Sequence, residues 1–562
     1  MTTLDQLALP PFNLAPADIE WVRLTRDAMG TEDRLRQLFV LTLNSDDTTL
    51  AAERVRFKVG GVLRDWGADF DKAWQTTHIV IEGSEVPPFI AGDLECGGYG
   101  FPCMTPLPNP LGVAAMDDLS LSGEVSSLLA AEGRAMGFNW SFTPVVDINA
   151  RLDSAIVGTR SYGSDPERIT QQALVHVQAL QARGIAATAK HWPGEGFDFR
   201  DQHLVTTVNP LDMDAWQANF GNIYRRLFEA GTLSVMTGHI ALPAWVRHCS
   251  PGAGREAFAP ASVSREINHV LLREVMGFNG AVTSDATSMA GLTSWADRAE
   301  AVPQVIQNGC DVFLFSPDAE RDLDHMRAGL RKGALTEQRL DDAITRILGL
   351  KAKLGLHRLS VDERLLPKAE LKERLRQPAA MALAERAASA SITLVKDTGV
   401  LPLSPQKHRR VVVISAGIEN SRPGVAPVPL DGVLEGLRAA GFEPRAYELA
   451  NPPTRENADL VLYLVAKESR MLASRVFLDW RVLHGNDIRA SMRRFWHELS
   501  VVMLSFGHAG HLIDAPGVPA YINAYSPIET VQRAVLRKLL GEEPYTAISP
   551  VDAFCGQDAA RW

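Results

Sequence analysis

Residues 185–203 read IAATAKHWPGEGFDFRDQH. The stretch opens with an apolar run, 185–189, of the kind that forms a strand buried on both faces. Two ionisable residues, Lys190 and His191, end this run. A proline and two glycines follow and exclude a helix there. The stretch therefore predicts a buried strand whose polar end leads into a loop, and that loop carries an Asp-Gln-His triplet.

The triplet predicts a site of proton transfer. An imidazole titrates near neutral pH, so His203 can both donate and accept a proton. The Asp201 carboxylate can hydrogen-bond one ring nitrogen, which fixes the tautomer and stabilises the imidazolium. An isolated Asp-x-His is usually a solvated loop with a capping Asp. The neighbouring Lys-His pair, and the proline and glycines between it and the triplet, favour the catalytic interpretation.

The same pattern of apolar run, polar or glycine end and helix-like segment recurs along the first part of the chain. Helical apolar spacing occurs between the runs, for example at 120–136, 169–183, 216–230 and 264–276. Eight strands alternating with helices over about 320 residues predict a TIM-type (β/α)8 barrel, with an open doubly wound sheet as the less favoured alternative. The expected strands are 39–43, 59–63, 88–92, 142–146, 185–189, 233–237, 280–283 and 311–315.

Ionisable residues stand at consecutive strand ends. In a parallel barrel all carboxyl ends open on the same face, where active sites are built. A charged residue at one strand end is usually a solvated boundary or a helix cap, but five ends in succession predict a polar cup suited to a hydroxyl-rich ligand. The residues at these ends are Asp93, Asp147, Lys190, His191, His239 and Asp285.

These motifs resemble the β-N-acetylhexosaminidase branch of glycoside hydrolase family 3. The stretch from Lys190 reads K-H-x-P-G-x-G-x4-D-x-H, and residues 277–289, GFNGAVTSDATSM, are similar to the family's G-F-x-G-x-x-x-S-D. Residues 137–147 and 160–166 match two further family patterns, G-x-N-x4-P-V-x-D and R-[SA]-[FY]-G-[SE]-D-P. The resemblance implies a (β/α)8 barrel followed by a smaller α/β sandwich domain.

The resemblance also implies roles for individual residues. Asp285 matches the nucleophile, which attacks the anomeric carbon and holds a glycosyl ester; capping of the next helix is the alternative for this Asp. His203, oriented by Asp201, matches the acid/base group. Asp147 matches as well, with a structural hydrogen-bonding role as its alternative. The residues implied to contact the substrate are Asp93, Arg160, Lys190, His191, His239 and Met289.

Two places depart from the family pattern. After the third strand the branch often reads D-x-E-G-G-R, whereas this chain reads DLECGGY from Asp93, with one residue apparently inserted and no arginine. Glu195 stands where many members have a second His. We expect both changes near the leaving group or acceptor, where they would affect aglycone preference more than the sugar held beside the nucleophile.

The carboxy-terminal third has its own pattern. Strand-like runs at 411–415, 460–465, 501–506 and 520–524 alternate with helical segments, as in a doubly wound sheet. We therefore expect a catalytic barrel at 1–360, a helical linker at 361–378 and an α/β sandwich domain at 379–562.

Composition limits the partners. The chain has 562 residues and a net charge of −10, which argues against nucleic acid or an anionic membrane. Residues 1–20 lack a basic-then-apolar run, no apolar stretch is long enough to span a bilayer, and the 5 cysteines are scattered, so a reducing, cytoplasmic location is expected. The absence of C-x-x-C and H-E-x-x-H gives no sign of a metal, and no organic cofactor is expected. A monomer or homodimer is expected.

The family resemblance implies a retaining, exo-acting β-N-acetylglucosaminidase with a small carbohydrate substrate. Phosphate instead of water as acceptor would make it a phosphorylase, because a neutral imidazole does not repel an incoming anion as a carboxylate would. A β-glucosidase is less favoured, because such members lack the Lys-His to Asp-x-His signature. Joint retention of Asp201, His203 and Asp285 argues against a non-catalytic sugar-binding protein. The aglycone, a peptidoglycan fragment or a chitin oligomer, stays open.

Overall fold

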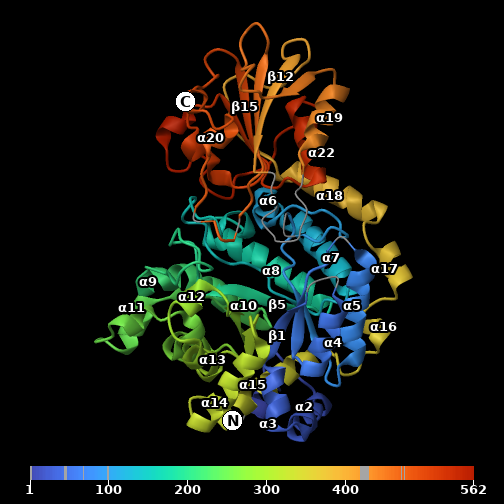
Figure 1. Cartoon of the computed structure of the whole chain (residues 1–562), viewed down its shortest axis with the longest axis vertical. Helices are drawn as coiled ribbons and strands as arrows, with labels where there is room; N and C mark the ends of the chain where they lie inside the picture. The colour runs from blue at the N-terminus through green and yellow to red at the C-terminus, as the bar shows by residue number, and fades with distance from the viewer. Residues whose placement is uncertain are drawn as a thin grey trace.

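The computed structural model describes residues 3–43, 47–67, 69–97, 100–417, 429–469, 471–473 and 475–562. Its main feature is a closed barrel followed by a separate six-stranded sheet. Figure 1 shows the barrel in blue, green and yellow, with the second sheet in orange and red above it. The amino terminus lies beneath the barrel and the carboxyl terminus lies beside the second sheet.

The barrel confirms the predicted TIM-type fold and excludes the open sheet. All its strands are parallel, and the order β1-β10-β9-β7-β5-β4-β3-β2 closes when β1 pairs with β2. The strands are short and almost wholly buried, as expected of a sheet covered by helices. They are β1 (Phe39–Leu43), β2 (Gly61–Arg64), β3 (Phe89–Gly92), β4 (Trp140–Ser141), β5 (Ala186–Trp192), β7 (Ser234–Thr237), β9 (Ala281–Ala286) and β10 (Val312–Leu314).

Strand boundaries differ from the prediction at the active-site end. The fourth strand lies at Trp140–Ser141 and not at 142–146, because Pro144 has no N–H to donate and the chain beyond it makes only the isolated bridge Val145 to Lys190. Conversely, β5 continues through Lys190 and His191 to Trp192. Its register shifts between Ala189 and Trp192, an irregularity of the kind that re-aims side chains beside active sites.

Amphipathic helices cover the outside of the barrel. The expected helix at 120–136 is α7 (Leu119–Ala135), which is capped by the Asp118 side chain and buries Leu121, Val125 and Leu129. The expected helices at 216–230 and 264–276 both contain π-helical turns, at Gln217–Gly221 and Glu266–Val275. The other barrel helices include α2 (Pro16–Ala28), α3 (Thr31–Gln37), α4 (Thr48–Phe57), α5 (Phe70–Gly83), α6 (Pro110–Ala115), α8 (Pro166–Ala182), α10 (Asn222–Glu229), α11 (Pro243–Cys249), α12 (Ala290–Thr293), α13 (Arg298–Gln307), α14 (Ala319–Lys332) and α15 (Glu337–Lys353).

The second sheet has the order β11-β16-β15-β14-β12-β13, with β11 antiparallel to its neighbour and the others parallel. All four expected runs form strands. The sequence analysis missed β13, an edge strand of half-exposed residues without an apolar run, and did not define β11. The strands are β11 (Thr393–Asp397), β12 (Arg410–Ala416), β13 (Glu443–Ala446), β14 (Leu460–Val465), β15 (Ser500–Ser505) and β16 (Ala520–Asn523).

Helices join and flank the second sheet. Within the expected linker lie α16 (Val361–Arg364) and α17 (Lys368–Arg374), and α18 (Pro378–Ser391) follows. The long helices α19 (Asp431–Ala439) and α22 (Glu529–Leu539) pack on one face of the sheet, and the short helices α20 (Trp480–Leu483) and α21 (Ile488–Ser491) follow β14. Among the described residues, no helix combines the length and the apolar character needed to cross a membrane. All 5 cysteines are free.

The second sheet meets the barrel through the chain that follows its parallel strands. Ser469, after β14, bonds Thr159 of the barrel. His508, after β15, contacts the Ser154 carbonyl, and the Tyr525 carbonyl, after β16, accepts from the Asn109 side chain. The carboxyl ends of three strands of the second sheet therefore face the barrel loops that follow β3 and β4.

Candidate active site

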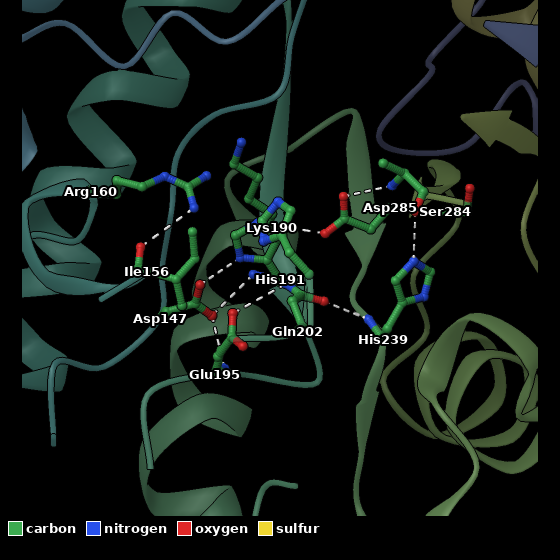
Figure 2. A network of polar contacts seen from close by, with 12 residues as sticks. Asp147, Ile156, Arg160, Lys190, His191, Glu195, Gln202, His239, Ser284 and Asp285 are labelled. Carbon is green, nitrogen blue, oxygen red and sulfur yellow. Dashed lines mark hydrogen bonds and ion pairs between the residues drawn. The ribbon is translucent and has the colours of Figure 1, made fainter. Parts of the chain in front are cut away.

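Asp285 lies within β9, and its carboxylate points toward His191, as Figure 2 shows. Oδ1 accepts from the Ala286 N–H at 2.7 Å, whereas the buried Oδ2 has no hydrogen-bond partner among the described residues. His191 Nε2 lies 3.9 Å from Oδ2. The next helix, α12, begins at Ala290 without a side-chain cap, which excludes helix capping by Asp285. A buried carboxylate oxygen without a partner is rare, and it is suited to react.

The charge around Asp285 favours its ionised form. Burial alone raises the pKa of this carboxyl. The nearby His191 and His203, together with the Ala286 N–H, lower the pKa more, so that it lies below its ordinary value. Asp285 is therefore a carboxylate at neutral pH, as a nucleophile must be.

Asp201 and His203 form the expected pair. His203 Nδ1 lies 2.7 Å from Asp201 Oδ1, and the His203 main-chain N–H donates to the same oxygen at 2.8 Å. Burial raises the pKa of Asp201, but its hydrogen bonds to His203 and to the Leu472 N–H lower it more, below the ordinary value. An ionised Asp201 accepts the Nδ1–H, so Nε2 is the ring nitrogen that can exchange a proton with a substrate.

A buried ionic cluster brings together three of the implied sugar contacts. Lys190 Nζ lies 2.9 Å from Asp93 Oδ1 and 3.0 Å from Glu95 Oε1. Arg160 makes a bidentate ion pair with Glu95, in which Nε donates to Oε2 at 2.8 Å and Nη2 donates to Oε1 at 2.9 Å. Burial raises the pKa of Glu95, but Arg160 and Lys190 lower it far below its ordinary value. Glu95 is thus the shared anion that fixes both cations.

The sequence analysis assigned no role to Glu95. The signal that could have found it is its position in the sequence: Glu95 is the third residue of the family-like DLE stretch that follows the third strand. Gly98 and Tyr99, which end the departing stretch, lie outside the described residues.

Asp147 orients His191. His191 Nδ1 lies 2.6 Å from Asp147 Oδ2, and Asp147 Oδ1 accepts from the main-chain N–H groups of His191 and Glu195 at 3.1 and 2.9 Å. The ring of His191 is therefore held with Nε2 toward Asp285 (Figure 2). This geometry matches the structural alternative for Asp147, which acts through His191.

Glu195 lies inside the protein beside the dyad loop, and its expected place near the leaving group or acceptor stays a prediction. The side chain is buried, accepting from Gln202 Nε2 at 3.1 Å and from Thr207 Oγ1 at 3.3 Å. Burial, with Asp147, Asp201 and Asp285 nearby, raises the pKa of Glu195 well above its ordinary value. Residues 190–196 are all buried, so the loop that begins with the proline and glycines turns inward and places the Glu195 carboxyl inside the protein.

Gln202, the middle residue of the triplet, was also missed. Its Nε2 donates to Glu195, and its Oε1 accepts from the His239 N–H at 2.6 Å (Figure 2). The side chain thus ties the dyad loop to the chain that follows β7. A glutamine between two catalytic candidates carries no signal of this kind in the sequence.

The contacts of His239 point to a supporting role, and its expected contact with the sugar stays a prediction. Nε2 lies 3.0 Å from the Ala286 carbonyl, to which it must donate, so Nδ1 accepts from Ser262 Oγ at 2.8 Å. Burial lowers the pKa of His239, in keeping with this neutral tautomer. Both ring nitrogens are engaged by the protein, and His239 supports the backbone beside Asp285. Met289 is buried just before α12, and its contact with substrate stays a prediction.

Asp147, His191 and Glu195 are close enough to suggest a metal site, with one ligand atom of each within 4.8 Å of the others. Asp147 and His191 are instead joined to each other, with His191 Nδ1 donating to Asp147 Oδ2, and the Glu195 carboxyl accepts from Gln202 and Thr207. Burial and the neighbouring carboxylates raise the pKa of Glu195, which disfavours the deprotonated form that a metal ligand needs. The cluster fits a hydrogen-bond network better than a cation site.

Comparisons with known proteins identify the family of this chain. The family model described as "Glycosyl hydrolase family 3 N terminal domain" matches residues 31–350. A beta-N-acetylglucosaminidase/beta-glucosidase of Cellulomonas fimi is 39% identical over 565 residues, covering 98% of this chain and 99% of the relative.

Two solved structures extend the comparison. The beta-glucoside phosphorylase BglX bound to 2FGlc has a TM-score of 0.91 and 34% identity, covering 98% of this chain and all of that one. A family 3 beta-N-acetylglucosaminidase from Paenibacillus sp. str. FPU-7 shares the fold, with a TM-score of 0.77 at 22% identity. Matched by the family model across its barrel and by a relative over almost its whole length, this chain belongs to glycosyl hydrolase family 3, as its motifs predicted.

Proposed function

We propose that this protein hydrolyses terminal β-linked N-acetylglucosamine by double displacement, with Asp285 as the nucleophile. The observation that carries the proposal is the buried Asp285 carboxylate, whose Oδ2 has no partner among the described residues and lies 3.9 Å from His191 Nε2. A retaining glycosidase needs a carboxylate of this kind, together with a group that moves a proton at the leaving oxygen. The bonded pair Asp201 and His203 supplies the second requirement.

The first step forms a glycosyl ester. Asp285 Oδ2 attacks the anomeric carbon as the bond to the leaving oxygen breaks, and His203 gives its proton to that oxygen. In the second step His203 takes a proton from water, whose oxygen attacks the anomeric carbon and releases Asp285. Asp201 stays ionised throughout and stabilises the imidazolium between proton transfers.

The ionic cluster is suited to hold the sugar. Asp93, Lys190 and Arg160 offer acceptors and charged donors for hydroxyl groups, and Glu95 keeps the two cations in place. Charge-assisted hydrogen bonds of this type fix both position and orientation. We assign this cluster and His191 to the sugar that undergoes substitution.

The test of the nucleophile is covalent trapping. A 2-fluoro or 5-fluoro glycosyl probe should label Asp285, and Asp285→Asn should lose roughly a thousandfold or more in kcat, because no other group can form the ester. Labelling of a different carboxylate would refute the assignment.

The choice of sugar needs its own measurement, because the Cellulomonas fimi relative is named for two activities. We expect an aryl β-N-acetylglucosaminide to be turned over with a higher kcat/KM than the matching aryl β-glucoside. The reverse order would favour a β-glucosidase.

A second candidate is phosphorolysis, which shares the first step and uses phosphate in the second. The observation that favours it is the likeness to a beta-glucoside phosphorylase over 98% of this chain. Turnover should be compared in phosphate and in a phosphate-free buffer of equal ionic strength. Free N-acetylglucosamine at an unchanged rate supports the hydrolase, whereas N-acetylglucosamine-1-phosphate with a clear gain in rate supports the phosphorylase.

A further inference from the structure

The chain that follows β14 in the second domain reaches the barrel at residues 468–469 and 472. Glu468 Oε1 accepts from the Asn109 side chain at 2.6 Å, which anchors the start of the segment to the barrel. The described residues farther along it then contact the two polar sides of the active site. None of the sequence motifs pointed to this segment.

The first contact is beside Arg160. Ser469 Oγ accepts from the Thr159 N–H at 2.7 Å, and the Ser469 N–H donates to Thr159 Oγ1 at 2.9 Å. Thr159 immediately precedes Arg160 in the 3-10 turn Gly158–Arg160. The fit is close, because a Cβ at Gly158 would lie 2.4 Å from Ser469 Oγ. The two buried hydroxyl groups thus clamp the turn that carries Arg160.

The second contact is on the catalytic pair. The Leu472 N–H donates to Asp201 Oδ2 at 2.9 Å, on the oxygen that His203 does not use. Leu472 has a left-handed backbone, with φ of 64°, and its side chain is 66% exposed. An apolar side chain left in solvent contributes little packing there, so the contribution of Leu472 to the site is its main-chain N–H.

We propose that two residues of the second domain position both polar sides of the active site, with Ser469 fixing Arg160 through Thr159 and the Leu472 N–H fixing Asp201. The inference rests on the proposed function, in which Arg160 holds the sugar and Asp201 orients the acid/base. Both residues lie on loops, and loop side chains keep a productive geometry only when neighbouring groups hold them. A displacement of about 1 Å is enough to lower the rate strongly. The second domain therefore completes the active site without contributing a catalytic residue of its own.

The Arg160 side is tested at Thr159. Thr159→Val keeps the shape but removes the acceptor of the Ser469 N–H, whereas Thr159→Ser keeps it. We expect Thr159→Val to lower kcat/KM on the order of tenfold, mainly through KM, and Thr159→Ser to restore it. Thr530→Val is the matched control, because Thr530 Oγ1 makes another contact to the barrel, at the Pro106 carbonyl (3.1 Å), and touches none of these residues. Equal kinetics for Thr159→Val and Thr530→Val would overturn this side of the proposal.

The Asp201 side is tested at Leu472. Leu472→Pro removes the N–H and, because proline fixes φ near about −65°, also abolishes the left-handed backbone that presents it, whereas Leu472→Gly keeps both the N–H and that backbone. We expect Leu472→Pro to lose about tenfold more kcat/KM on a disaccharide than on an activated aryl glycoside, because only the poor leaving group needs protonation. Leu472→Gly should show no such difference. A thermal unfolding measurement on both variants checks that each of them folds. The same substrate dependence in both variants would contradict the proposal.

A third measurement separates this inference from the proposed function. In Ser469→Ala, hydrogen exchange at the Thr159 amide should speed up clearly, because the amide loses its acceptor. Unchanged exchange would overturn the clamp whatever the reaction is. If the probe fails to label Asp285, the proposed function falls and the inference falls with it. If Asp285 is labelled but Thr159→Val and Leu472→Pro behave as their controls do, only the inference falls.

Discussion

Three of the carboxyl groups in the active site have environments that shift their pKa values in different directions. His side chains lower the pKa of Asp285, and hydrogen bonds lower that of Asp201. Glu195 is surrounded by carboxylates in a buried position, and its pKa is raised well above the ordinary value. Two groups are therefore ready to act as anions, while the third carries its proton. Environment, and not residue type, makes this division.

The state of Glu195 predicts a pH-dependent effect on stability. Its folded-state pKa lies above the unfolded value, so the folded protein retains a proton that the unfolded chain releases above about pH 4.3, and Glu195 lowers stability as the pH rises from there. Glu195→Gln mimics the protonated acid without this cost. We expect its Tm to exceed that of the wild type at pH 7.5, with a difference that shrinks toward pH 5. A constant difference across this range would show that Glu195 is already ionised.

The assignment of His203 predicts a dependence on the leaving group. His203→Ala should lose far more kcat/KM with alkyl glycosides or disaccharides than with activated aryl glycosides, since only the former need a proton at the leaving oxygen. Asp201→Asn should show a milder form of the same dependence. Equal losses for both classes of substrate would exclude His203 as the acid.

At the scale of elements, the loop between β5 and the dyad depends on backbone freedom. Gly196 has φ of 114°, and a Cβ there would lie 1.8 Å from the Ile148 carbonyl oxygen. The neighbouring Ile148 N–H donates to the Glu195 carbonyl at 3.1 Å, so the two backbones are in direct contact. A side chain at this position would have to move main chain, and the dyad loop would move with it.

Gly196→Ala should therefore lower both stability and activity. The matched control is Gly231→Ala, where φ is 84° but no atom lies within 4 Å of the added Cβ. The control isolates the strain of a left-handed alanine, on the order of 1–2 kcal/mol. We expect Gly196→Ala to lower Tm further than the control and to lose most of its kcat. Similar values for the two variants would show that the loop can shift without harm.

At the scale of the whole molecule, the active site lies where the carboxyl ends of both sheets meet. Asn109 holds this junction from the barrel side: its Oδ1 caps α6, and its Nδ2 donates to Glu468 Oε1 and to the Tyr525 carbonyl. One amide group thus links a helix start to two loops of the second domain.

Asn109→Asp should weaken this junction more than Asn109→Ala. The carboxylate still caps α6 but cannot donate, and it faces Glu468, which lies 2.6 Å from the amide nitrogen in the wild type. We expect a lower Tm for Asn109→Asp than for Asn109→Ala at neutral pH and a smaller gap at pH 4, where carboxyl groups become protonated. A higher Tm for Asn109→Asp at pH 7 would show that the two groups separate freely.

The sequence by itself determined the barrel, the main strands of the second sheet and the candidate catalytic residues. Buried strands require unbroken apolar runs, and chemistry at a strand end requires specific residue types, so both leave local patterns such as IAATAKH and the Asp-x-His pair. Asp285 and His203 could be identified as candidates because distinctive sequence motifs flank both of them.

Only the tertiary structure decided which groups share a proton or a contact. Glu95, Gln202 and Leu472 act through partners 65, 37 and 271 residues away in the chain, namely Arg160, His239 and Asp201. Folding sets such distances, and the protonation of Glu195 likewise depends on carboxylates that three different loops and strands bring together. No local sequence pattern encodes a contact between distant segments. The residues that flank each partner are selected by the packing of their own helix or strand, and not by the contact.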